Sequence, residues 1–323
     1  MGSLQRLALT ILTAILAVCA GSAFAADPYP VKPVRVIVPV GPGGGDDFAA
    51  RVVAAKLSEL LGQQFIVENR PGAGGMIGQT LVAKSAPDGY TLLLAGGSMA
   101  GARFVNANIT YDLMRDFTPV SLIETSPFVM VANPSLTARN VKEFIAQARS
   151  RPGKMTFATL GAGQIPYWSV MLFNSMAGVD TVEIQYKSPS EATLDVIAGR
   201  VDYFFAPVIT ALANKDKLRL LAVTAITRSE MLPDVPTMAE AGLPDYEMPA
   251  WRSFMGPAGL NREIVETLNG AMVRGLAAPD VRERFAKAGS VATSSSPEEL
   301  RKRYADWMLI FGKISKDAGL KPQ

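Results

Sequence analysis

The sequence predicts an α/β protein of two domains, each with a mostly parallel sheet flanked by helices. The chain has 323 residues, more than one ordinary domain needs. A short apolar run, a glycine cluster and a helical pattern follow one another in residues 34–61, and the same order recurs in residues 155–178. Two such units can face each other across a cleft and hold one ligand from both sides.

The first unit is a strand, a loop and the start of a helix. Residues 34–38 have the length and β-branched content of a buried strand. Within residues 48–61 the apolar side chains recur at helical spacing, and Gly62 is placed to end this helix. Asp46 or Asp47 is expected to cap this helix. Because the first turn leaves N–H groups free at the positive end of the helix dipole, the loop suits an anion.

The glycine loop alone is a weak signal. The pattern Gly41-x-Gly43-x-x-Asp46 lacks the third glycine of a dinucleotide fingerprint, and no Gly-Lys-Ser/Thr follows as in a P-loop. A tight strand-to-helix turn without a ligand is the alternative interpretation.

The rest of the first half continues the α/β pattern. Two further strands are predicted at 64–68 and 90–95, each followed by a loop of small residues, with a helix at 76–85 between them. Strands that all end in such loops indicate a parallel sheet whose strand ends face one side. After a polar turn at 111–117, apolar runs at 118–124 and 127–132 are interpreted as strands leading out of the first domain.

The second half repeats the opening and then returns. Asn140 is expected to cap a helix, Pro166 is suited to the first turn of another, and Ser188 with Glu191 forms a capping-box pattern. The predicted helices are 141–149, 166–177, 192–198, 261–278 and 297–316. The predicted strands are 155–159, 182–186, 203–205, 218–224 and a return crossing to the first domain at 251–257.

Composition excludes several classes of function. The net charge is only +3 and Lys and Arg are not clustered, so no nucleic-acid partner is expected. The chain has no His, which removes Ser-His-Asp and Cys-His catalysis and the commonest metal ligand. Its one cysteine, Cys19, lies in the leader described next. We therefore expect neither a metal nor a cofactor.

Residues 1–25 are typical of an export signal. Arg6 precedes an apolar stretch at 7–20, and Ala23-Phe24-Ala25 fits a cleavage site before Ala26. The alternative, a lipid anchor on Cys19, is disfavoured because Val18 is a poor residue before a lipidated cysteine. The chain is therefore expected to be exported.

With these motifs in place, the chain resembles the periplasmic receptors of tripartite tricarboxylate transporters, the Bug family. The resemblance extends over essentially the whole mature chain. Its most specific segments are Asn69-Arg70-Pro71-Gly72-Ala73-Gly74-Gly75 and Leu232-Pro233-Asp234-Val235-Pro236-Thr237. Further matching segments are Val38-Pro39, Pro87-Asp88-Gly89-Tyr90, Gly161-x-Gly163, Tyr186-Lys187, Gly199-Arg200-Val201-Asp202, Arg228, Trp251 and Pro257-Ala258-Gly259.

The resemblance implies a fold and a function. The fold is a two-domain periplasmic-binding-protein fold of type II, with two crossing strands joining residues 26–125 plus 246–323 to residues 126–245. The function is capture of a small organic carboxylate in the periplasm and its delivery to a small and a large membrane subunit. We also expect a monomer, and we expect no enzymatic activity because the mature chain offers no His, no Cys and no metal-ligand spacing.

The resemblance further implies that backbone N–H groups of two loops and waters hold the carboxylate. Carried over by position, the ligand-binding residues are Val40, Gly41, Gly43, Gly44, Gly45, Asp46 and Asp47 in the first loop and Thr159, Gly161, Ala162, Gly163 and Gln164 in the second. Ser98 in the loop after the third strand, and Lys187 and Asp202 in matching segments, complete the expected site.

Departures from the family pattern bear on the ligand. Asp46 stands where the family usually has Thr or Ser, and either caps the helix and faces away or selects a ligand with an amine or hydroxyl near its carboxylate. Phe48, Tyr167 and Trp168 are bulky residues beside the loops. They are either core residues or the wall of an apolar cleft that accepts an aromatic or longer carboxylate.

Two other functions use the same residues. A ligand-sensing periplasmic protein that signals to a membrane partner would have the same fold and cleft. A hydrolase would have to recruit Ser98, Lys187, Ser188 or Ser190, because the mature chain offers no His or Cys. Lys187 is more simply a charge at the edge of the cleft.

Overall fold

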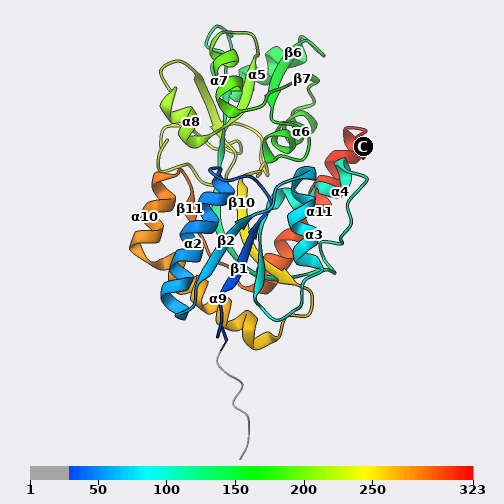
Figure 1. Cartoon of the computed structure of the whole chain (residues 1–323). Coiled ribbons are helices and arrows are strands. Elements are labelled where there is room, and N and C mark those ends of the chain that lie inside the picture. Colours follow the sequence, from blue (N-terminus) through cyan, green and yellow to red (C-terminus); the bar gives the residue numbers. More distant parts are fainter. Residues whose placement is uncertain (1–28, 323) are drawn as a thin grey trace, which may run out of the picture.

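The computed structural model describes residues 29–322, which form two lobes, one above the other in Figure 1. This architecture confirms the two-domain α/β fold. The expected export signal, its cleavage before Ala26 and the alternative anchor Cys19 lie outside the described residues.

The lower lobe in Figure 1 contains a six-stranded sheet in the order β11-β4-β10-β3-β1-β2. Its strands are β1 (Val34–Val38), β2 (Phe65–Asn69), β3 (Thr91–Gly96), β4 (Phe117–Ser126), β10 (Ala250–Pro257) and β11 (Val291–Ala292). The strands β2, β1 and β3 are parallel, whereas β10 lies antiparallel between β3 and β4.

The upper lobe contains a five-stranded sheet in the order β7-β6-β8-β5-β9. Its strands are β5 (Phe128–Ala132), β6 (Met155–Thr159), β7 (Thr181–Gln185), β8 (Tyr203–Pro207) and β9 (Arg219–Val223). Here β7, β6 and β8 are parallel, and β5 pairs antiparallel with β8 and β9.

The sheets are mixed, so the expected "mostly parallel" pairing is wrong in this detail. Each sheet has a parallel core of three strands, as the glycine-loop units predict. The chain then passes from β4 directly into β5 of the other lobe and returns in β10. Of these crossing strands, β10 runs against the parallel strands of the lower lobe and β5 runs against those of the upper lobe, so both sheets gain antiparallel pairs.

Helices cover both sheets. In the lower lobe they are α2 (Gly45–Leu61), α3 (Met76–Ala83), α4 (Ala102–Val105), α9 (Arg262–Ala277), α10 (Pro279–Lys287) and α11 (Pro297–Asp317), with 3₁₀ turns η1 (Ala73–Gly75) and η2 (Gly97–Ala100). In the upper lobe they are α5 (Val141–Arg149), α6 (Ile165–Ala177), α7 (Pro189–Ile197) and α8 (Val208–Ala213). Within residues 29–322, no helix has the length and apolar content needed to cross a membrane.

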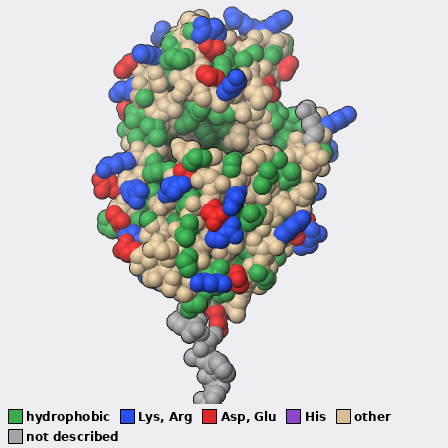
Figure 2. All heavy atoms as spheres, viewed as in Figure 1, with side chains coloured by type: hydrophobic (Ala, Val, Ile, Leu, Met, Phe, Trp, Pro, Cys, Tyr) green, Lys and Arg blue, Asp and Glu red, His purple; other side chains and the backbone are tan. Residues whose placement is uncertain are grey.

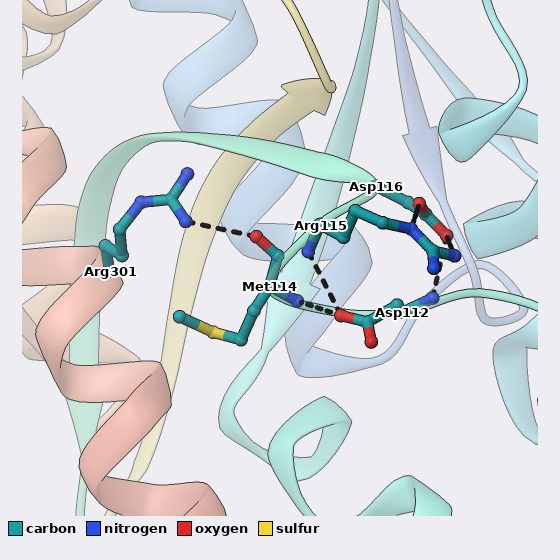
Figure 3. A network of polar contacts seen from close by, with 5 residues as sticks. All are labelled: Asp112, Met114, Arg115, Asp116 and Arg301. Atoms are coloured by element: carbon teal, nitrogen blue, oxygen red, sulfur yellow. Dashed lines mark hydrogen bonds and ion pairs between the residues drawn. The ribbon is translucent and has the colours of Figure 1, made fainter.

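The polar segment before β4 is a turn, as predicted, and its own side chains hold it (Figure 3). The Asp112 carboxylate accepts the N–H groups of Met114 and Arg115, and Asp116 accepts the Asp112 N–H at 2.7 Å. Arg301 of α11 donates to the Met114 carbonyl at 3.1 Å. The turn therefore fastens α11 to the start of the strand that leads to the other lobe.

An apolar core runs through both lobes. Trp168 of α6 in the upper lobe is fully buried, and its ring lies 4.5 Å from that of Phe311 of α11 in the lower lobe. Trp307 packs against Phe311 and also against Trp251 at the start of β10. These are the three tryptophans of the chain, and all of them lie in the core where the two lobes meet.

The longest helix, α11, begins with a complete capping box. The Ser296 hydroxyl accepts the Glu299 N–H at 3.1 Å, and the Glu299 carboxylate accepts the Ser296 N–H at 2.8 Å. We expect Ser296→Ala to lower the free energy of unfolding by about 1 kcal/mol, the usual cost of losing a cap. Urea titration followed by circular dichroism measures it. Ser296→Asp, which keeps an acceptor, is the control, and equal losses in both variants would contradict this role of the cap.

Candidate functional site

The first loop presents free backbone N–H groups where α2 begins, at the boundary between the lobes (Figure 1). The helix cap is Gly44, not Asp46 or Asp47, and no side chain of the described residues caps this end. Within residues 29–322 the N–H groups of Gly44, Gly45 and Asp46 have no hydrogen-bond partner. Gly43, Gly44 and Gly45 are exposed, so the start of the helix is open to a ligand.

Asp47 holds this loop in shape instead of facing a ligand. It is buried, and its carboxylate accepts the Gly43 N–H at 3.0 Å, the Asn69 amide at 3.0 Å and the Arg51 guanidinium at 3.0 Å. The hydrogen bond from Arg51 is the main cause that lowers the pKa of Asp47 to about 2, and the bonds from Gly43 and Asn69 lower it further. The Gly43 N–H, which was expected to face the ligand, is therefore bound within the loop instead.

The stability contributed by Asp47 is expected to depend on pH. Its pKa is lower in the folded state than in the unfolded state, so ionisation stabilises the fold above about pH 4, and this is lost as the pH falls toward 2. We expect Asp47→Asn to be less stable than the wild type at pH 7 by about 1–3 kcal/mol. Denaturant unfolding at pH 7, 4 and 2.5 measures the gap, which should narrow as the pH falls. A gap that is constant over this range would contradict the role of the charge.

The second loop follows β6 and leads into α6. The Thr159 hydroxyl is buried and accepts the Gly161 N–H at 3.0 Å, so Thr159 shapes the loop and this N–H is not free. Gly161 has φ of +105°, a conformation that favours glycine. Gln164 caps α6 without a side-chain bond, and within the described chain the N–H groups of Ala162 and Gly163 have no partner.

The two lobes enclose a hollow, visible between them in Figure 2. A cavity of about 110 Å³ lies between Gly74, Gln79 and Ser98 of the lower lobe and Ala162, Gly163 and Gln164 of the upper lobe. Ser98 in η2 is thus brought together with the second loop. A larger cavity of about 380 Å³ beneath α4 shares Met99, Ala102, Asn106 and Ile109 with it.

Two sequence candidates outside the glycine loops, Lys187 and Asp202, lie at opposite ends of the upper sheet. Lys187 follows the carboxyl end of β7, on the same side as the second loop, and is exposed. Asp202 lies at the amino end of β8, where its carboxylate accepts the N–H of Thr156 at 2.7 Å and the Thr156 hydroxyl at 3.1 Å. This is the opposite end of the strands from the loop, which contradicts the expected ligand contact of Asp202.

Sequence reasoning missed an ion cluster beside the first loop. Arg252 of β10 binds both Asp46 of α2 and Glu124 of β4. Glu124 is directly opposite Arg252 in the antiparallel strands and is 1% exposed. Each is the only charged residue in its strand, and that signal could have identified them.

The bulky aromatic residues beside the loops are part of the core. Tyr167 and Trp168 are buried, and Phe48 packs edge-on against Phe285 of α10. The structure therefore favours the core interpretation of these side chains over the aromatic wall of a cleft. Within the described residues no group of His, Cys, Asp and Glu could hold a metal ion.

Two lobes joined by crossing strands, with a helix N-terminus from each lobe at the boundary, define a two-domain solute-binding protein. The sequence matches the family model described as tripartite tricarboxylate transporter family receptor over residues 49–320. The chain belongs to this family of receptors.

Several proteins are similar to it over most of their length. BugT of Bordetella pertussis is 36% identical over 92% of this chain and 92% of its own. The solved structure of R. palustris Rpa4515 with adipate is 32% identical, with a TM-score of 0.78, over 91% of this chain and all of that one. MatC of Rhodopseudomonas palustris with bound malate is 31% identical, with a TM-score of 0.74, over 89% of this chain and all of that one.

Proposed function

We propose that this receptor captures a small organic carboxylate between the free N–H groups of the two loops. The main support is geometric: the starts of α2 and α6 both open at the lobe boundary with unpaired N–H groups. Two helix N-termini stabilise an anion without needing a lysine or arginine. The adipate and malate in the two similar structures support the same class of ligand.

Capture is proposed to work by closure of the two lobes, hinged where the crossing strands join residues 26–125 plus 246–323 to residues 126–245. A ligand that touches both loops favours the closed state because only that state offers all its contacts. The closed monomer then docks on a small and a large membrane subunit and performs no catalysis. Export with cleavage before Ala26 places it in the periplasm.

Thermal unfolding against a panel of carboxylates tests this proposal. The full-length chain is expressed, purified after export and passed through a denatured step to remove bound ligand. The panel contains adipate, malate, citrate, amino acids and aromatic acids. A ligand at 100 times its dissociation constant adds about 2.7 kcal/mol of stability, which shifts the melting temperature measurably. No shift with any carboxylate would contradict the proposed ligand class.

A further inference from the structure

The ion cluster of Arg252, Asp46 and Glu124 lies at the first loop. Arg252 donates through Nε to Asp46 and through Nη1 to Glu124, so two edges of the guanidinium are occupied. Glu124 is buried and fixed in the neighbouring strand, whereas the Asp46 side chain is 32% exposed. The two carboxylates hold the plane of the guanidinium in place.

The third edge of Arg252 is turned toward the start of α2. Its Nη2 has no hydrogen-bond partner within residues 29–322. Nη2 lies 2.7 Å from the position that a Cβ on Gly45 would occupy, so the guanidinium rests directly on this glycine. The free N–H groups of Gly45 and Asp46 belong to the same turn. An unpaired cationic donor and unpaired amides therefore meet at one place.

We infer that Arg252 is a specificity-determining residue that donates to the anionic group held by the first loop, and that Asp46 and Glu124 position it. This inference rests on the proposed function. A guanidinium bonds a carboxylate more strongly than a neutral donor does and imposes a direction on it. Asp46 accordingly does not read an amine on the ligand, because Arg252 already supplies its cationic partner.

Substitution of Arg252 is the first test. The probe is the panel carboxylate that stabilises the wild type most, and the readout is its dissociation constant by calorimetry. Arg252→Met is expected to weaken binding at least tenfold, and Arg252→Lys, which keeps the charge, to recover part of the loss. Arg262→Met is the matched control, because Arg262 is exposed on α9 and, among the residues that the structure describes, pairs only with Glu266 along its own helix. Equal affinities of Arg252→Met and the wild type would overturn the inference.

Asp46→Asn separates a positioning role from recognition of an amine. The probes are hexanoate, adipate and 6-aminohexanoate, which share a six-carbon chain and differ at the far end, and the panel carboxylate chosen above accompanies them. The asparagine side chain still accepts a hydrogen bond from Arg252, and the substitution removes a negative charge near the ligand. We therefore expect each probe to bind within threefold of its wild-type affinity, or more tightly, with the same ratio of variant to wild-type affinity for all probes. A selective loss of affinity for 6-aminohexanoate or for an amino acid would show that Asp46 binds an ammonium group, and would overturn the assignment.

Gly45→Ala tests the geometry without changing any charge. The added methyl group must displace the Arg252 guanidinium, so affinity is expected to fall at least fivefold. Gly270→Ala is the matched control: it is also a helical glycine beside an arginine, but its Cβ would lie 3.5 Å from Arg274, in ordinary contact. Unchanged binding by Gly45→Ala would contradict the placement of Arg252. A wild type that binds no carboxylate would instead overturn the proposed function, and this inference with it.

Discussion

A proline at position 44 is expected to weaken carboxylate binding by about ten- to a hundredfold while the fold stays intact. Gly44→Pro removes an N–H group that has no partner in the described chain, and a hydrogen bond to a charged group contributes about 1.5–3 kcal/mol. The fold should tolerate proline, since φ at Gly44 is −87° and no atom of residues 29–322 lies within 4 Å of a Cβ there. Calorimetry measures the affinity, and thermal unfolding without ligand checks the fold.

Gly44→Ala is the informative comparison, because it adds a carbon at the same position but keeps the N–H. Loss of affinity in the proline variant alone assigns the effect to the missing donor. Proline at Gly161 would be a poorer test, because φ there is +105° and its N–H already donates to Thr159. If Gly44→Pro binds as tightly as the wild type, the first loop does not hold the ligand through this amide.

The elements that carry the site could be predicted from the sequence because local signals define them. In each strand-loop-helix unit an apolar run, glycines and a helix stop follow one another along the sequence. The structure contains both predicted units, β1 with α2 and β6 with α6. The short helices α4 and α8 and the helix α10 were missed. Two of them, at four and six residues, are too short for a periodic pattern, and α10 follows α9 after a single residue, so the boundary between the two is not visible.

The ligand-facing chemistry could be predicted only in part. The loop positions follow from sequence order, but which amides are free depends on local bonds such as those of Asp47 and Thr159. Arg252 lies 206 residues from Asp46 and 128 from Glu124. The pairing of the crossing strand β10 with β4 brings it beside Glu124, and the start of α2 brings Asp46 to it. Long-range contacts of this kind leave no spacing pattern in the sequence.

Trp168→Ala is expected to lower the free energy of unfolding by about 3–5 kcal/mol, as large-to-small substitutions of buried aromatic residues do. Trp168 is fully buried and contacts Phe311 and the backbone at Gly101, where a Cβ would lie 2.8 Å from its ring. Urea unfolding followed by circular dichroism measures the loss. The cavity that alanine leaves should also loosen the contact between α6 and α11. Because the second loop leads into the N-terminus of α6, we expect this loosening to weaken ligand binding.

Trp168→Phe distinguishes packing from polarity at this contact. The indole N–H of Trp168 is buried without a partner within the described residues, so phenylalanine removes an unsatisfied donor while keeping most of the aromatic volume. Its cost is expected to be less than half that of alanine. Equal losses in both variants would mean that packing on Phe311 is not the source of the stability. A loss confined to alanine, together with weaker binding, would instead show that the core between the lobes sets the position from which the second loop meets the ligand.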